Sequence, residues 1–148
     1  MFLNRIMIKT IFLSCVLIFL SYLSHSQTVW KRLDFPGEDP EDTLYAYQPS
    51  SVMPYNEPGK TGLFKVWLRN KERKITLHDI EYRNIKTVSH WAIDCTNREY
   101  KLLNVTYYDI HGTAIQYSEG HSNWEDAVPE SMADAIITSI CPIWKAKK

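Results

Sequence analysis

The sequence has no excess charge of either sign, because 17 lysines and arginines balance 17 aspartates and glutamates. Domains that bind nucleic acids need a basic face, so this balance gives no reason to expect a nucleic-acid partner. The chain also lacks a glycine-rich phosphate loop, an HExxH zinc motif and a nucleophile elbow. We therefore expect no enzymatic activity, no catalytic residues, no metal and no cofactor.

Long apolar runs are equally scarce, and the clearest one covers residues 11–23 near the N-terminus. This run is too short for a membrane-spanning helix, which needs about 20 residues, but it matches the apolar core of an export signal. Arg5 and Lys9 precede it as a basic n-region. The pattern predicts a signal peptide over residues 1–26 and no membrane span once that segment is removed.

Ser24 and Ser26 supply the small residues that a signal-peptide cleavage site needs, so we expect cleavage before Gln27. Two alternatives stay open, namely an uncleaved membrane anchor and a lipid attached to Cys15. Apolar residues continue past Cys15, whereas a lipid-bearing cysteine normally ends the apolar core. Cleavage would leave residues 27–148, a length that fits a single globular domain.

Cysteine is rare in this domain, which contains Cys95 and Cys141 alone. An even number of cysteines in an exported chain is typical of a disulfide formed in an oxidising compartment. The compartments that fit are the periplasm, the outer-membrane surface and the medium outside the cell.

The most informative stretch runs from His90 to Tyr117 and predicts three antiparallel strands. Alternating apolar residues and β-branched or aromatic residues indicate half-buried strands. The strands are expected over residues 90–95, 100–109 and 113–117. Polar residues 96–98 form the first turn, and Gly112 permits a positive φ in the second.

The sequence before this stretch predicts shorter strands. These are expected over residues 30–35, 44–55 and 63–68, with a kink at the proline of the second. Residues 69–74 (RNKERK) form a charge run that predicts a solvated turn, although a short basic patch can also serve a partner. Residues 75–88 predict an irregular link with one short strand near residues 80–82.

The C-terminal segment predicts one amphipathic helix. Ser131 and Asp134 form a capping-box-like pair at its start, and Pro142 is expected to end it. The apolar stripe comprises Ala133, Ile136, Ile137, Ile140 and Cys141. A helix with one apolar stripe must lie on the sheet, which brings Cys141 toward Cys95.

The predicted fold class is therefore α+β, an antiparallel sheet of about five to six strands with one C-terminal helix packed on it and tied by a Cys95–Cys141 disulfide. A sheet covered by one helix leaves its other face and an edge open, which favours a homodimer.

Few residues are candidates for chemistry. His111 and His121 flank one hairpin and are candidates for a shared metal or a haem contact. Asp94 is a candidate catalytic acid, although a strand-end carboxylate bonded to backbone is the commoner role. Three tryptophans form a candidate ligand platform or, more commonly, packing residues. They are Trp67, Trp91 and Trp124.

One set of residues, taken in order and spacing, resembles the surface-adhesin protein E family of Gram-negative bacteria. The set comprises residues 44–52, 66–67, 93–95, 98–103, 107–109, 128–131 and 140–141, with Trp30, Gly112 and Trp124. Its most specific parts are the aromatic-x-Asp-Cys strand and the helix that begins at Pro-x-Ser and ends in Cys.

The resemblance implies an antiparallel sheet with a disulfide-tied C-terminal helix and a binding function without catalysis. It also implies a protein ligand of the host-matrix or serum type, such as vitronectin, laminin or plasminogen, or another envelope protein, with haem as a further ligand. No motif is sharp enough to transfer ligand-binding residues, so none is assigned. The alternative is a small periplasmic structural or inhibitor domain.

Overall fold

The computed structural model of the protein describes residues 29–33, 35 and 45–147. The predicted signal peptide, its cleavage position and Cys15 lie outside these residues. The strands are β1 (Lys31–Arg32), β2 (Ala46–Tyr47), β3 (Met53–Pro54), β4 (Phe64–Leu77), β5 (Ile80–Asp94), β6 (Glu99–Tyr108), β7 (Ala114–Glu119) and β8 (Glu125–Asp126). A 3-10 helix spans Pro49–Ser51, and the α-helix α2 spans Met132–Lys145.

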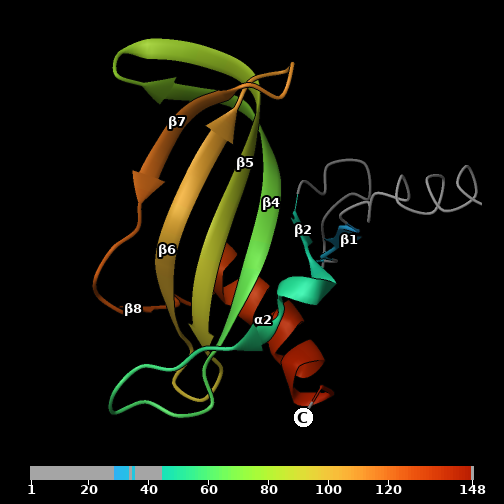
Figure 1. The fold of residues 1–148 in the computed structure, drawn as a ribbon, viewed down its shortest axis with the longest axis vertical. Coiled ribbons are helices and arrows are strands. Elements are labelled where there is room, and N and C mark those ends of the chain that lie inside the picture. Colours follow the sequence, from blue (N-terminus) through green and yellow to red (C-terminus); the bar gives the residue numbers. More distant parts are fainter. Residues whose placement is uncertain (1–28, 34, 36–44, 148) are drawn as a thin grey trace, which may run out of the picture.

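These strands form one antiparallel sheet with the order β1-β2-β4-β5-β6-β7, in which β3 also pairs with β4 and β8 with β6 (Figure 1). The predicted α+β class is confirmed. The sheet has eight strands rather than five or six, because β1, β2, β3 and β8 are two-residue strands that pair at its margins.

The predicted central meander is confirmed as β5, β6 and β7. Its first turn brings Arg98 to φ 55°, and its second brings Gly112 to φ 84°, the left-handed region that glycine occupies without strain. Gly120, after β7, lies so close to β6 that a Cβ there would stand 1.6 Å from the carbonyl oxygen of Leu102. Any side chain at position 120 would therefore clash with the backbone of β6.

The predicted turn over residues 69–74 was wrong, because this segment is strand. For residues 75–88, the predicted short strand near residues 80–82 is confirmed as part of β5, but the predicted irregular link was wrong, because strand continues on both sides of a two-residue turn. β4 continues through the charge run and meets β5 in a hairpin whose two-residue turn is His78-Asp79. Both turn residues have positive φ, 48° and 64°, as a tight hairpin of this kind requires. Neither residue is glycine, so the usual sequence signal for such a turn is missing.

The expected N-terminal strands are shorter than predicted. Of residues 30–35, two pair as β1, while Leu33 and Phe35 are buried in the core. Of residues 44–55, the described part divides into β2, the 3-10 helix and β3, because Pro49 starts a helical turn between the two strands. Residue 44 lies outside the description.

The predicted cap of α2 is confirmed, since the Ser131 hydroxyl accepts a hydrogen bond from the Asp134 amide at 3.2 Å. Pro142 does not end the helix, which continues to Lys145. The reason is tertiary packing: the Trp144 ring stacks on Phe64 with centroids 5.2 Å apart, and its indole donates to the Gly62 carbonyl. These contacts offset the hydrogen bond that the proline removes.

The core lies between α2 and one face of the sheet. Phe64, Val66 and Ile93 on the sheet face Ile136 and Ile140 on the helix, and all five are fully buried. The predicted disulfide is confirmed: Cys95, directly after β5, is bonded to Cys141 on α2, with a Cα–Cα distance of 5.8 Å. The helix is thus attached to the sheet by packing and by a covalent bond.

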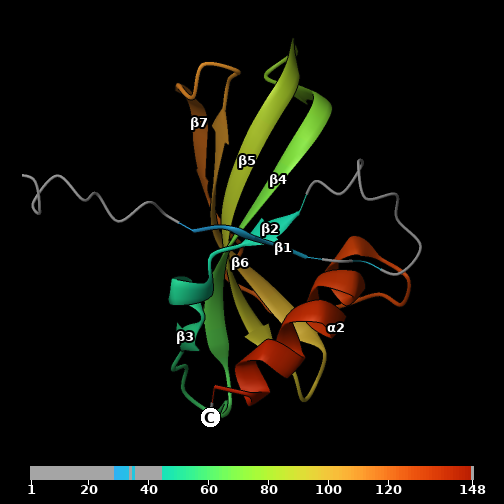
Figure 2. The same cartoon turned by 90° about the vertical axis from the view of Figure 1, so that its right-hand side faces the viewer.

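The helix covers only one half of one face. In Figure 2, α2 lies beside the lower half of the sheet, and no described helix lies on either face of the upper half. That upper half, which we call the distal half, ends in the β4–β5 and β6–β7 turns (Figures 1 and 2).

Candidate functional site

The face of the sheet opposite α2 carries side chains in rows that cross β4, β5, β6 and β7. The pairing register places directly opposed residues on the same face. The first row holds Trp67, His90, Asn104 and Glu119, the second Arg69, Val88, Thr106 and Tyr117, and the third Lys71, Lys86 and Tyr108. We call these residues, with Lys65 on the same face of β4, the open face.

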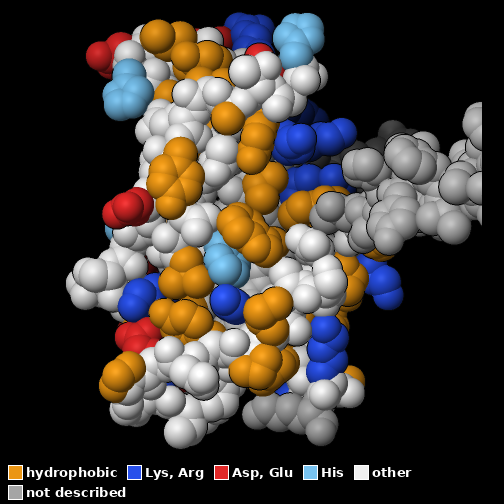
Figure 3. Space-filling view, viewed as in Figure 1, with side chains coloured by type: hydrophobic (Ala, Val, Ile, Leu, Met, Phe, Trp, Pro, Cys, Tyr) orange, Lys and Arg blue, Asp and Glu red, His pale blue; other side chains and the backbone are white. Residues whose placement is uncertain are grey.

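Strict alternation along β4 creates this surface. From Phe64 to Asn70, every second residue is buried toward the core, and Lys65, Trp67 and Arg69 between them are partly exposed. Figure 3 views the open face: apolar and aromatic side chains run along the middle of the sheet, and lysines and arginines gather toward the right-hand edge.

Several aromatic rings on or beside the open face are paired with other rings or with cations, whereas Tyr117 is exposed without such a contact among the described residues. Trp67 and His90 stack in parallel, with centroids 4.3 Å apart and an interplanar angle of 6°. Arg69 lies 4.8 Å from the centroid of the Trp30 ring. Burial lowers the pKa of His90, and the nearby Lys65 ammonium lowers it further, so both effects favour the neutral form of the His90 ring.

The cations of the open face have no acidic partner among the described residues. Elsewhere, Lys60, Lys74, Arg83, Arg98 and Lys101 each pair with a carboxylate. Within the described residues of the four central strands β4 to β7, the cations that make no ion pair all lie on the open face. They are Lys65, Arg69, Lys71 and Lys86.

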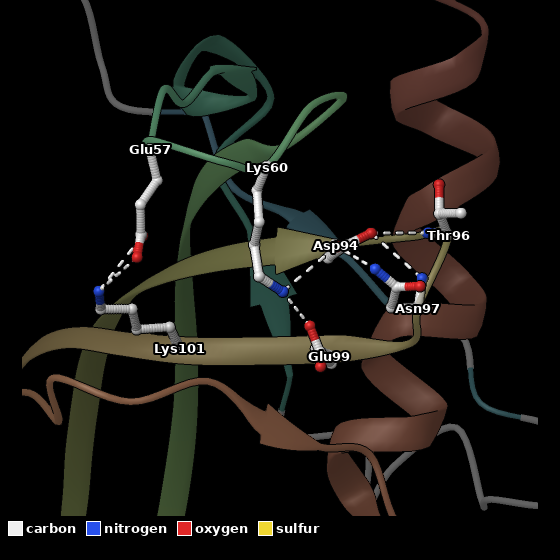
Figure 4. A network of polar contacts seen from close by, with 7 residues as sticks. All are labelled: Glu57, Lys60, Asp94, Thr96, Asn97, Glu99 and Lys101. Carbon is white, nitrogen blue, oxygen red and sulfur yellow. Dashed lines mark hydrogen bonds and ion pairs between the residues drawn. The ribbon is translucent and has the colours of Figure 1, made fainter.

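A polar network covers the lower end of this face (Figure 4). Lys60 bonds Glu99 and lies 3.6 Å from Asp94, and Lys101 bonds Glu57 at 3.2 Å. The Lys60 ammonium also lies 4.3 Å from the centroid of the Trp124 ring. These contacts hold the loop before β4 against the sheet, so only the remainder of the open face is accessible.

Asp94 is a structural carboxylate. One of its oxygens accepts hydrogen bonds from the amides of Thr96 and Asn97, and the other accepts from the Asn97 side chain. Burial alone would raise the pKa of Asp94, but these hydrogen bonds and the Lys60 ammonium outweigh it and hold the pKa below 3.8. The backbone role favoured by the sequence is the one that the geometry supports.

The other candidate residues are not brought together. His111 and His121 are exposed beyond opposite ends of β7, whose six residues span about 20 Å. In the part of the chain that the structure describes, no three histidine, cysteine or acidic side chains are grouped to hold a metal. Trp67 and Trp91 lie on opposite faces, because Trp91 packs on the core and stacks on Tyr100.

Sequence analysis offered Arg69 and Lys71 as part of a basic patch that can serve a partner, but it missed that they lie on a strand, and it missed Lys86 altogether. The first two fell in a predicted turn and the third in a predicted irregular link. The signal that would have found them is the alternation Lys65, Trp67, Arg69, Lys71, which continues the period of the preceding strand.

A concavity lies near the start of α2, away from the open face. It has a volume of about 470 Å³ and is lined by Phe35, Met132, Ala135 and Thr138, among others. Arg98 bonds Asp134 and Thr138 beside it and so joins the β5–β6 turn to the helix.

No helix in the described ranges is long and apolar enough to cross a membrane.

Comparisons with known proteins agree on one family. A family model described as surface-adhesin protein E matches residues 30–142. Two solved structures of Haemophilus influenzae protein E share the fold. Crystal form II aligns with a TM-score of 0.55 and 11% identity over 82% of this chain and 94% of that one. The selenomethionine form aligns with a TM-score of 0.51 and 12% identity over 78% and 98%. No curated protein sequence matches the chain.

Proposed function

The chain belongs to the surface-adhesin protein E family, and from this premise we propose that it is an exported, non-enzymatic binding protein whose ligand is a host-matrix or serum protein. The two turns that end the distal half are the binding element. They extend beyond the helix (Figures 1 and 2), as a segment dedicated to binding would.

The observation that carries this proposal is the exposure of large apolar side chains at the distal end. Ile80, the first residue of β5 beside the β4–β5 turn, is 55% exposed, and Ile110 in the β6–β7 turn is 67% exposed. Both turns lie at the same end of the molecule (Figures 1 and 2). Exposed apolar groups gathered on one surface are typical of a protein-binding site.

Binding to immobilised vitronectin, laminin and plasminogen tests the proposal. We expect the purified protein to bind at least one of them, and the double variant Ile80→Ser, Ile110→Ser to bind about tenfold more weakly, since each isoleucine loses apolar burial. The matched control is Met53→Ser, Val128→Ser, which removes side chains that are 41% and 65% exposed outside the two distal turns. No binding to the three proteins, or equal loss in both variants, would contradict the proposal.

Export is the second part of the proposal. Residues 1–26 are the signal peptide and residues 27–148 the mature domain, whose disulfide requires an oxidising compartment. N-terminal sequencing of the mature protein is expected to begin at or near Gln27. An intact Met1 or lipid on Cys15 would contradict it.

Localisation separates the adhesin from a periplasmic structural or inhibitor domain. Protease treatment of intact cells is expected to degrade the mature protein, because a surface adhesin is accessible. Full protection in intact cells, with degradation only after the outer membrane is opened, would favour the periplasmic role.

We further propose that two copies assemble through β7. In the described sheet, β7 is the edge strand beyond β6, and an unpaired edge invites pairing with a second strand. Pairing of two β7 strands would join two open faces into one surface. Light scattering at tens of micromolar is expected to give a dimer mass, and a monomer mass would contradict it.

A further inference from the structure

The open face concentrates positive charge in a protein whose total charge is balanced. Its three rows and Lys65 contain four lysine or arginine side chains and one carboxylate, that of Glu119 on the edge strand. Within the described residues, none of the four cations makes an ion pair. The balancing acidic residues are therefore elsewhere in the sequence, and the open face has a net positive field.

The arrangement of two lysines adds to this observation. Lys71 and Lys86 are directly opposite each other on β4 and β5, and like charges in such a pair destabilise a sheet. Lys86 lies 4.9 Å from the centroid of the Tyr108 ring, and among the described residues neither lysine has a carboxylate within the 4.0 Å of an ion pair. A ligand that carries negative charge would remove this cost.

The cations also have a linear arrangement. Lys65, Arg69 and Lys71 follow one another on the same face of β4, so their Cα atoms span about 20 Å along the strand. Lys86 adds a charge beside Lys71 on the neighbouring strand. The loop held by Lys60 covers only the lower end of the face. A ligand that matches this row is an extended polyanion rather than a small ion.

We propose that the open face binds a sulfated polysaccharide, through Lys65, Arg69, Lys71 and Lys86. This binding surface is distinct from the distal turns proposed above to contact a protein. The ligand chain runs along β4, and its sulfate groups lie over the row of cations.

The state of the aromatic rings argues against single-stranded nucleic acid. Such ligands stack their bases on free ring faces. On the open face, Trp67 and His90 cover one face of each other, and Lys86 covers one face of Tyr108. The ring of Trp30 is likewise covered by Arg69. Tyr117 is exposed and has no such contact among the described residues, but one uncovered ring does not form the series of rings on which successive bases stack.

The type of cation argues against an acidic peptide. Carboxylates are bound best by the two-pronged guanidinium group of arginine, whereas the lysine ammonium is a point charge on a flexible stem. Three of the four cations are lysines. The concavity near the start of α2 is lined by Phe35 and by residues between 130 and 138 and therefore lies away from the open face.

The test measures the affinity of the purified mature protein for immobilised heparin in 0.15 M salt. Lys71→Gln, Lys86→Gln is expected to bind about fivefold more weakly, the loss that two exposed ion pairs explain. Lys74→Gln, Arg83→Gln is the matched control, because it removes two charges from the same hairpin that already pair with Glu81. The control is expected to keep wild-type affinity, and rising salt should weaken all binding.

Three results would overturn the proposal: no binding of wild type to heparin, equal affinity of both variants, or tighter binding of polyglutamate or a single-stranded oligonucleotide than of heparin at the same salt. The Ile80→Ser, Ile110→Ser variant should bind heparin normally. Its behaviour therefore distinguishes failure of this proposal from failure of the proposed protein binding.

Discussion

Removal of the disulfide by the double substitution Cys95→Ala, Cys141→Ala should strongly destabilise the domain. The bond joins residues 46 apart in sequence, and cross-linking a loop of that length stabilises a protein by about 4 kcal/mol in the chain-entropy model. Cys141 is 8% exposed and belongs to the core, so loss of its packing adds to the effect. Since small domains are stable by about 5–15 kcal/mol, a large part of the total would be lost.

The measurement is guanidinium-induced unfolding at pH 7, followed by tryptophan fluorescence, of wild type and variant. We expect the free energy of unfolding to fall by about 4 kcal/mol and the slope against denaturant to rise, because the unfolded chain without a cross-link exposes more surface. Chemical reduction of the wild-type protein should reproduce the loss. Heparin binding by the folded variant should be unchanged, because the bond lies on the other face of the sheet.

A loss below about 1 kcal/mol would refute the reasoning, because it would mean that α2 is held by packing alone. Two free, rapidly reacting thiols in the unreduced protein would refute it more directly. A redox or metal-binding pair needs exposed thiols of low pKa, whereas Cys141 is buried on the apolar face of α2.

Three further predictions concern the stability of the fold. Ser131→Ala removes the helix cap and should lower the free energy of unfolding by about 1 kcal/mol; unchanged urea unfolding would contradict this. Gly120→Ala places a methyl group against the Leu102 carbonyl oxygen and should cost about 1–3 kcal/mol or more, which a wild-type melting temperature would exclude. The pKa of Asp94 is lowered in the folded protein, so its carboxylate stabilises the fold above the ordinary value of 3.8, and this contribution is lost as the pH falls through the lowered pKa. Asp94→Asn should therefore reduce stability at pH 7 and weaken its fall toward pH 3, and parallel pH profiles for wild type and variant would contradict the assignment.

The spacing of apolar residues in the sequence predicted those strands and the helix that bury one regular row of apolar side chains. The strands of the central meander and α2 were found because alternation and the 3.6-residue period are local properties of the sequence. Ser131 was found for the same reason, since a cap and its helix are adjacent. Cys95 and Cys141 were paired because Cys95 was predicted to end a strand and Cys141 to end the apolar stripe of the helix that packs on it.

The β4–β5 hairpin was missed because its distal part buries few residues. Residues 69–74 are mostly charged. Hydrophobic periodicity cannot identify a strand whose two faces are both polar, because no apolar residues alternate along it. The turn residues His78 and Asp79 adopt positive φ without glycine or asparagine, so no turn signal marked the register. Tertiary pairing with β5, rather than local preference, keeps this segment extended.

The open face was invisible to sequence reasoning for a related reason. Lys71 and Lys86 are 15 positions apart, and they meet only when the hairpin is continuous and its register is known. Trp67 and Trp91 were grouped together, although Trp67 is opposite His90 and Trp91 is therefore on the other face. A one-residue difference in register exchanges the two faces of a strand.

Stability and binding are separated along the length of the sheet. The core, the helix cap and the disulfide lie in the lower half, where α2 packs on Phe64, Val66 and Ile93. The unpaired cations and the exposed isoleucines lie on the other face or in the distal half. Substitutions in the distal half remove little core packing, so charge and shape there can vary at small cost in stability. This arrangement allows a single fold to present different binding surfaces, which is consistent with the 11% identity to Haemophilus influenzae protein E at a shared fold.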